Sequence, residues 1–254
     1  MNKEIKKDGE FEYLDAGQGP VMIVLHGLFG ALSNFRDVVD HFSSSYRVVI
    51  PIMPIYTMPI INTNIKNLAR HIEAFIDHMG FEDVIMLGNS LGGHVGLIYA
   101  TMCPDKLRAL VLTGSSGLYE NAFGSSYPRK NDYEYIRNRV EYTFYDPQTA
   151  SKELVDEVFG LLSDKSKAIR SISLAKSAIR HNMAHELPNM HVPVCLIWGR
   201  NDNITPPEVA EEFHKNLPDS DLFWIDECGH APMMERPEEF NRLLSRWLSS
   251  RNFI

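Results

Sequence analysis

Residues 83–100, DVIMLGNSLGGHVGLIYA, decide the fold of this 254-residue chain. An apolar run at 83–88 predicts a buried strand, and the run at 91–103 predicts a helix that follows at once. The glycines of the intervening turn, 88–92, allow the strand and the helix to approach without Cβ clashes. Ser90 is therefore expected on a sharp strand-to-helix turn, with its hydroxyl above the carboxyl edge of a sheet. The alternative for Ser90 is a helix cap without chemistry.

The rest of the chain alternates between apolar runs of strand length and stretches of helical periodicity. Predicted strands lie at 11–17, 20–27, 46–52, 107–114, 192–199 and 221–228, and predicted helices at 34–42, 64–80, 206–217 and 237–250. Near-continuous apolar strands separated by helices indicate a parallel sheet that is covered on both faces. We therefore predict an α/β protein with a mostly parallel, twisted sheet flanked by helices.

Residues 118–188 interrupt this alternation. The segment has no apolar strand and carries ten basic and ten acidic residues, so the remainder of the chain holds the whole net charge of −8. Because strands resume after residue 191, we predict a helical cap, 118–188, inserted into an α/β core formed by 1–117 and 189–254. The alternative is a separate helical domain.

Composition excludes several classes of protein. A hydrophobic content of 44% and a charged content of 23% are ordinary for a globular chain. The net charge of −8 argues against nucleic acid as a partner, because phosphate binding needs a positive surface. No apolar run approaches the ~18 residues of a membrane span, and the first ten residues lack the apolar stretch of a signal peptide. Three scattered cysteines indicate neither a disulfide framework nor a zinc cluster, and a cytoplasmic location is expected.

Three further motifs lie outside the central segment: HGLFG (26–30), WGRND (198–202) and CGHAPMMERPEEF (228–240). With GNSLGG they resemble the α/β-hydrolase superfamily, in its capped branch of serine carboxylesterases and C–C hydrolases, over nearly the whole chain. The resemblance implies the α/β-hydrolase fold, with Ser90 as nucleophile, Asp202 as acid and His230 as base in that chain order. It also implies an oxyanion hole made by two backbone N–H groups, and a histidine that fixes one of their loops. The two donors are Leu28 and Leu91, and the loop-fixing histidine is His26.

The chemistry supports these roles residue by residue. A serine hydroxyl is a weak nucleophile unless a neighbouring base removes its proton, and histidine has a suitable pKa near neutral pH. A carboxylate on the far imidazole nitrogen fixes the tautomer and stabilises the imidazolium. His230 and Asp202 each follow a predicted strand, as residues of carboxyl-end loops should. Asp226 and Glu227 are rival acids, but they lie too close in sequence to His230 to come from a different loop.

A serine nucleophile indicates acyl transfer to water. Carboxylic esters of small, largely apolar compounds are the predicted substrates, with neither a cofactor nor a metal. Hydrolysis of C–C bonds in vinylogous diketones is the first alternative, since Asn89 resembles the residue before the serine in C–C hydrolases. Leu28, Phe29 and Ala231 depart from that branch. A small-molecule receptor on the same scaffold is the second alternative. Phe29, Met233 and Met234 are expected to line the substrate pocket, because methionine adapts to irregular space.

Two further segments are open to more than one interpretation. The apolar loop 51–61, PIMPIYTMPII, is predicted to form a wall of the acyl pocket or a protein contact, including a homo-oligomer contact. Its alternative is burial under the cap. Residues 165–185 predict an amphipathic helix with a basic face, because they contain five Lys or Arg and no acid. That face is expected either to be solvated or to attract anionic substrates or lipid.

Overall fold

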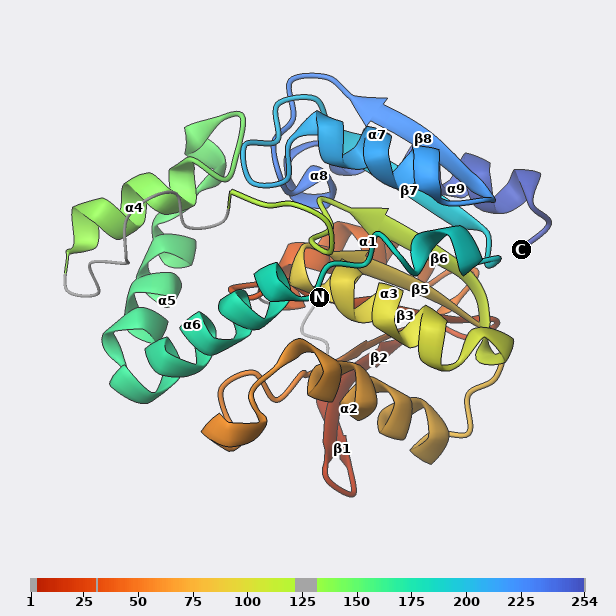
Figure 1. Ribbon diagram of the computed structural model, residues 1–254, viewed down its shortest axis with the longest axis horizontal. Helices are drawn as coiled ribbons and strands as arrows, with labels where there is room; N and C mark the ends of the chain where they lie inside the picture. The colour runs from red at the N-terminus through yellow and green to blue at the C-terminus, as the bar shows by residue number, and fades with distance from the viewer. Residues whose placement is uncertain (1–3, 31, 122–131, 254) are drawn as a thin grey trace.

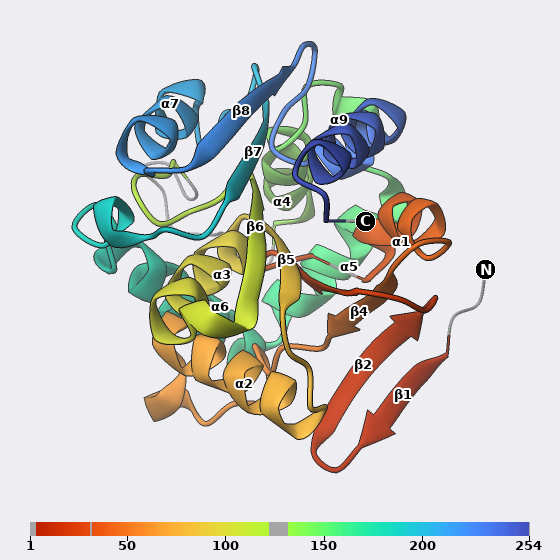
Figure 2. The same cartoon turned by 90° about the vertical axis from the view of Figure 1, so that its right-hand side faces the viewer.

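The computed structural model describes residues 4–30, 32–121 and 132–253, and its centre is an eight-stranded sheet (Figures 1 and 2). The strand order is β1-β2-β4-β3-β5-β6-β7-β8, in which β2 runs antiparallel to both neighbours and the pairs from β4 to β8 are parallel. The strands are β1 (Ile5–Asp8), β2 (Phe11–Ala16), β3 (Val21–Leu25), β4 (Arg47–Pro51), β5 (Val84–Asn89), β6 (Leu107–Thr113), β7 (Val194–Gly199) and β8 (Ser220–Ile225). The predicted mostly parallel sheet is confirmed.

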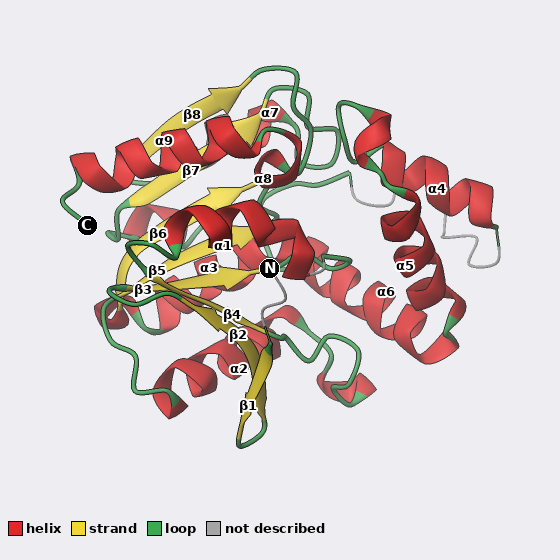
Figure 3. Ribbon diagram, turned by 180° about the vertical axis from the view of Figure 1, so that it is seen from behind, coloured by secondary structure: helices red, strands yellow, loops and turns green. Residues whose placement is uncertain are grey.

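Helices cover both faces of the sheet (Figure 3). One layer holds α2 (Ile65–His78), α3 (Leu91–Met102) and α7 (Pro207–Asn216), and the other holds α1 (Arg36–Phe42), α8 (Pro232–Glu235) and α9 (Pro237–Ser250). Side chains alternate between the two layers along each central strand: in β7, Leu196 and Trp198 belong to the first core, and Cys195 and Ile197 to the second. Burial on both faces explains why these strands have continuous apolar sequences.

The edge strand β1 was not predicted from the sequence. Its residues, IKKD, are all exposed, so they carry no apolar alternation. The strand forms because it pairs antiparallel with β2 through four residues. Lys6 and Lys7 also form ion pairs with Asp15 and Glu12 of β2. An edge strand held by backbone pairing and surface ion pairs leaves no hydrophobic pattern in the sequence.

Among the residues that the structure describes between β6 and β7, three helices extend to one side of the sheet (Figure 1). They are α4 (Tyr133–Glu141), α5 (Lys152–Ser163) and α6 (Lys165–Arg180). A short 3₁₀ turn at Pro147–Thr149 lies between α4 and α5, and another at Leu187–Asn189 follows α6. All fall within the predicted cap, of which residues 122–131 lie outside the described residues. The helix predicted at 165–185 ends earlier, because His181 leaves the helical backbone region with φ −97° and ψ 86°.

The loop at 51–61 does not form a wall of the substrate pocket, which was one of its predicted roles. Met53 and Ile55 are buried in the core beside α2, and no residue of the loop lines the cavity described below. Arg170 of α6 donates through Nε to the carbonyl oxygen of Met58 at 2.7 Å, which ties the loop to α6. The pocket-wall interpretation is therefore wrong, since these apolar side chains pack inward. The end of the loop remains outside: Ile60 and Ile61 are exposed.

No helix in the described ranges is both long enough and apolar enough to cross a membrane.

Candidate active site

Ser90 lies between β5 and α3 with a strained backbone, φ 54° and ψ −120°. Its N–H donates to the carbonyl oxygen of Thr113 at 3.1 Å, and its own carbonyl accepts the N–H of Ser116 at 3.2 Å. A Cβ on Gly92 would lie 2.2 Å from the carbonyl oxygen of Leu25, so α3 approaches β3 closely only because this residue is glycine. Local sequence and neighbouring strands together hold the serine on the predicted turn.

Asp202 lies in the loop after β7, and its side chain is fully buried. Its Oδ1 accepts the backbone N–H groups of Ile204 at 2.8 Å and Thr205 at 2.9 Å. Its Oδ2 accepts the Thr205 hydroxyl at 2.8 Å. Several donors converge on one buried carboxylate, so its orientation is fixed before any substrate binds.

His230 follows β8 and meets this carboxylate. Its Nδ1 lies 2.9 Å from Oδ2 and 3.1 Å from Oδ1 of Asp202. Burial alone would lower the pKa of His230, but the charge and hydrogen bond of Asp202, with the charges of Glu120 and Glu235, raise the pKa above its usual value. With Nδ1 donating to Asp202, Nε2 of the neutral ring is left to accept a proton.

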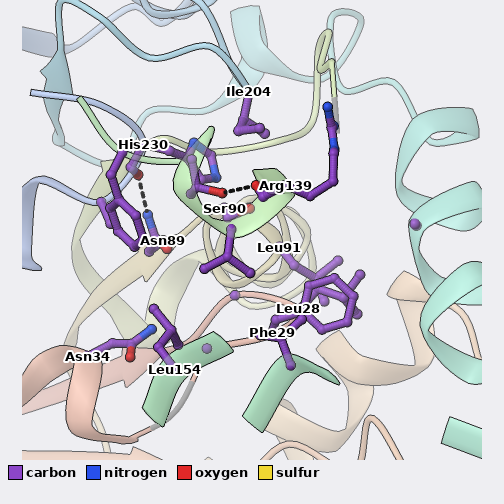
Figure 4. Close-up of a pocket in the computed structure, with 18 of the residues that line it drawn as sticks. Leu28, Phe29, Asn34, Asn89, Ser90, Leu91, Arg139, Leu154, Ile204 and His230 are labelled. Carbon is purple, nitrogen blue, oxygen red and sulfur yellow. Dashed lines mark hydrogen bonds between the residues drawn. The ribbon is translucent and has the colours of Figure 1, made fainter. Parts of the chain in front are cut away.

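Ser90 and His230 line one cavity of about 210 Å³ (Figure 4). Among the described residues, the hydrogen bonds of the His230 ring are on its Nδ1 side and none joins it to Ser90 Oγ; such bonds often tighten only with substrate. The apolar part of the lining comes mainly from the core loop after β3 and from the three helices between β6 and β7. It comprises Leu28, Phe29, Leu91, Ile136, Val140, Phe144, Leu154, Val158, Leu162, Ala175, Ala178, Ile204, Ala231 and Met234.

The two expected oxyanion donors both lie on this cavity. Leu91 is the first residue of α3, so its N–H has no acceptor within the helix. The Gly27 carbonyl, which shares a peptide unit with the Leu28 N–H, accepts the N–H of Gly30 at 3.1 Å and Nδ1 of His26 at 2.9 Å. These bonds hold the peptide plane of Leu28 and agree with a structural role for His26.

Two of the three expected pocket residues line the cavity. Phe29 and Met234 do so, whereas Met233 does not. Met233 is 1% exposed and packs in the core between the sheet and α9, so its predicted pocket role is wrong. The two methionines are neighbours in α8, where successive side chains point about 100° apart.

Two positioning residues were not identified from the sequence as such. Asn89 Nδ2 donates to the carbonyl oxygen of Thr113 at 3.0 Å. It also donates to the carbonyl oxygen of His230 at 3.1 Å (Figure 4). Glu235 accepts the N–H groups on either side of His230, from Gly229 at 3.0 Å and Ala231 at 3.3 Å. The histidine loop is thus held from the serine turn and from α8.

Two charged residues of the cavity were also missed. Burial raises the pKa of Glu120 to about 7, and the nearby His230 acts in the opposite direction. Arg139 of α4 reaches the cavity and stacks on the ring of Tyr142, 5.1 Å from its centroid. Neither residue lies in a motif, and both come from the predicted cap, so only packing reveals them.

Asp226 and Glu227, the two alternative candidates for the catalytic acid, pair with arginines instead of His230. Asp226 is largely exposed and pairs with Arg200 at 2.7 Å, and Glu227 pairs with Arg236 at 3.1 Å. Within the described part of the chain, no group of three or more His, Cys, Asp or Glu side chains is arranged to hold a metal ion.

Comparisons with known proteins agree with the fold. The family model of the α/β hydrolase fold matches residues 20–153 and 129–237. An α/β-hydrolase enzyme from the sediment metagenome of the Mar Chica lagoon, Morocco, is 47% identical, with a TM-score of 0.82 over 98% of this chain and 99% of that one.

Two curated relatives are more distant. A 2-hydroxy-6-oxononadienedioate/2-hydroxy-6-oxononatrienedioate hydrolase of Pseudomonas sp. is 27% identical over 95% of this chain and 93% of its own length. A 2-hydroxy-6-oxo-6-(2'-aminophenyl)hexa-2,4-dienoic acid hydrolase of Metapseudomonas resinovorans is 28% identical over 95% and 88%. The family model matches most of the chain, and Ser90 lies on a strained strand-to-helix turn. This chain is therefore a hydrolase that belongs to the α/β-hydrolase family.

Proposed function

We propose that the protein is a serine hydrolase that cleaves carboxylic esters of small, largely apolar compounds through an acyl-enzyme. The observation that carries this proposal is the cavity in which Ser90 and the Asp202-paired His230 meet below apolar walls. Its volume is about 210 Å³, and most of the side chains around it are apolar. A short or medium acyl chain fits that space.

In this mechanism Nε2 of His230 takes the proton of Ser90 as Oγ attacks the ester carbonyl. The developing oxyanion accepts the N–H groups of Leu28 and Leu91, and Asp202 stabilises the imidazolium. His230 then returns the proton to the leaving alcohol, and the acyl group stays on Ser90. Water, activated by the same histidine, attacks the acyl-enzyme and releases the acid.

The second candidate is C–C hydrolysis of vinylogous diketones. Two observations favour it: the names of the curated relatives, and Arg139 on the cavity, because a dienoate substrate carries a carboxylate. The cavity lining also contains uncharged polar residues such as Tyr135 and Thr143, but most of its side chains are apolar, which suits a neutral ester better. A receptor role on this scaffold is the third candidate.

Steady-state kinetics on two substrate series distinguish these functions. We expect turnover of p-nitrophenyl esters with an optimum at short or medium acyl chains, and little or none of a 2-hydroxy-6-oxohexa-2,4-dienoate. The reverse order of kcat/KM replaces the ester assignment by C–C hydrolysis, and Arg139→Gln should then lower kcat/KM for the dienoate more than for the ester. Saturable binding without turnover of either series identifies a receptor. A cytoplasmic location and a homo-oligomer also remain predictions.

A further inference from the structure

A second concavity lies outside the catalytic cavity, between the start of α2 and the last turns of α6. Its volume is about 700 Å³. Lys66 and Arg70 of α2 line it on one side, and Lys176 and Arg180 of α6 on the other. The described lining contains no Asp or Glu and is completed by amide, hydroxyl and imidazole side chains together with Ile61 and Ile65. A chain with a net charge of −8 thus has one groove where cations gather.

The positive potential of this groove affects a neighbouring histidine. Burial, with the charge of Lys66, lowers the pKa of His181 below its usual value, although Glu186 acts in the opposite direction. Ser177 Oγ accepts the N–H of Ile65 at 3.1 Å, so the two walls are joined at the base of the groove. The cations are therefore held on a fixed surface that faces outward.

Exposed isoleucines border the same groove. Ile61 is 90% exposed and Ile60 is 49% exposed, at the end of the apolar loop. The loop is fixed against α6, since Ser173 Oγ donates to the carbonyl oxygen of Thr63 at 3.1 Å and Arg170 binds Met58. Ile61 also lines the groove itself.

The outer side of α6 continues this pattern. Its sequence, KSKAIRSISLAKSAIR, contains no acidic residue, and Ile169 and Ile179 are exposed at 40% and 53% beside exposed lysines and Arg180. Cations that alternate with exposed aliphatic side chains are typical of helices that lie on an anionic membrane. The other side of α6 contributes Ala175 and Ala178 to the catalytic cavity, so the surface and the active site share one helix.

We propose that this surface, formed by Ile60, Ile61, Lys66, Arg70 and the outer side of α6, docks onto an anionic phospholipid bilayer. Lipid phosphates occupy the groove, and the isoleucines enter the outer layer of the bilayer. Binding of a free phosphate ion would not explain why Ile60 and Ile61 are exposed beside the groove. A symmetric dimer through this face brings cations of one copy against the same cations of the other. The lipid surface is the occupant that complements both the charge and the apolar side chains.

Vesicle flotation tests this proposal with the full chain. The protein should float with vesicles of phosphatidylcholine and phosphatidylserine, should not float with phosphatidylcholine alone, and should detach as the salt concentration rises. Each Lys or Arg near such a surface contributes about fivefold to partitioning. The double variant Lys66→Gln/Arg180→Gln should therefore bind roughly 25-fold more weakly. The matched control, Lys215→Gln/Arg246→Gln, removes two exposed cations from α7 and α9 and should bind like the wild type.

Ile61→Ser provides an independent variant, because it changes the apolar contact and leaves the charge intact. It should weaken flotation while the far-UV circular dichroism spectrum stays native. Absence of flotation by the wild type, or an equal loss in the groove and control variants, overturns the proposal. Titration with inorganic phosphate that saturates the groove without any vesicle binding identifies a small-anion site instead. A wild-type dimer that dissociates on Ile61→Ser, again without vesicle binding, identifies an interface between copies.

Discussion

Asn89, the residue before the candidate nucleophile, donates a hydrogen bond from Nδ2 to the backbone carbonyl of His230 at 3.1 Å. The same nitrogen donates to the carbonyl oxygen of Thr113 at 3.0 Å. The side chain is buried, so it joins the serine turn, the end of β6 and the histidine loop where water does not compete. The side-chain amide of Asn89 therefore helps to fix the position of His230 relative to Ser90.

Asn89→Ala should lower both stability and turnover. The buried carbonyl of His230 loses its donor, whereas the carbonyl of Thr113 keeps the N–H of Ser90, so the cost is about 1–3 kcal/mol for the one group left without a partner. The histidine loop then loses one of its supports, so kcat should fall more than KM rises. Thermal unfolding and ester kinetics on the same preparation measure both effects. An unchanged kcat with a lowered Tm would restrict Asn89 to a structural role.

Ser90→Ala should lower kcat by about 10⁴–10⁶, since it removes the group that forms the acyl-enzyme. A fluorophosphonate probe should add its mass to the wild type and fail to modify the variant, as intact-mass spectrometry measures. Turnover retained at the wild-type rate would assign the nucleophile to another residue.

Asp202→Asn should lower kcat by about 10⁴, because an amide at this position favours the wrong tautomer of His230. Asp226→Asn is the matched control, since that exposed carboxylate pairs with Arg200 outside the cavity. Its kinetics should match those of the wild type. Comparable losses in the two variants would mean that the acid has been assigned to the wrong residue.

Glu120→Gln should move the acid limb of the pH profile. His230 acts as a base only when neutral, so kcat/KM falls as the pH drops through its pKa. The charge of Glu120 raises the pKa of His230, and glutamine removes that charge, so the acid limb should shift to lower pH. Burial raises the pKa of Glu120 to about 7, and its charge acts on His230, so the two groups titrate as a coupled pair.

The profile of kcat/KM for one ester between pH 5 and 9 measures this shift. Glu208→Gln, an exposed change on α7, is the control and should leave the acid limb in place. A shift to higher pH in Glu120→Gln contradicts the assignment.

Gly92→Ala and Gly160→Ala should change stability in opposite directions. At Gly92 the new Cβ would lie 2.2 Å from the carbonyl oxygen of Leu25, so the helix must shift and the free energy of unfolding should fall by several kcal/mol. At Gly160, an exposed position of α5, a Cβ meets no atom within 4 Å, and alanine should stabilise the helix by about 1 kcal/mol. Thermal or urea unfolding measures both changes, and equal Tm values for the two variants would refute the packing argument.

The sequence alone determined the features that depend on local sterics and on strand order. The serine turn could be predicted because the glycines around Ser90 are required by a tight strand-to-helix connection. Asp202 and His230 were assigned through the resemblance to the α/β-hydrolase superfamily. Their positions after predicted strands agree with that assignment, because strands of a parallel sheet bring their carboxyl ends to one edge. The continuous apolar strands indicated a sheet buried on both faces, because successive side chains of a strand point to opposite faces and nearly all of them are apolar here.

Tertiary structure decided which side chains of each element face the site. Glu120 and Arg139 reach the cavity, and Met234 faces it while Met233 turns into the core, because α4 and α8 are oriented by their packing against other elements. The same holds for the apolar loop, whose Met53 and Ile55 are covered and whose Ile61 is not. Periodicity gives the type of an element, but the direction of one side chain depends on neighbours distant in sequence, and no local pattern contains that information.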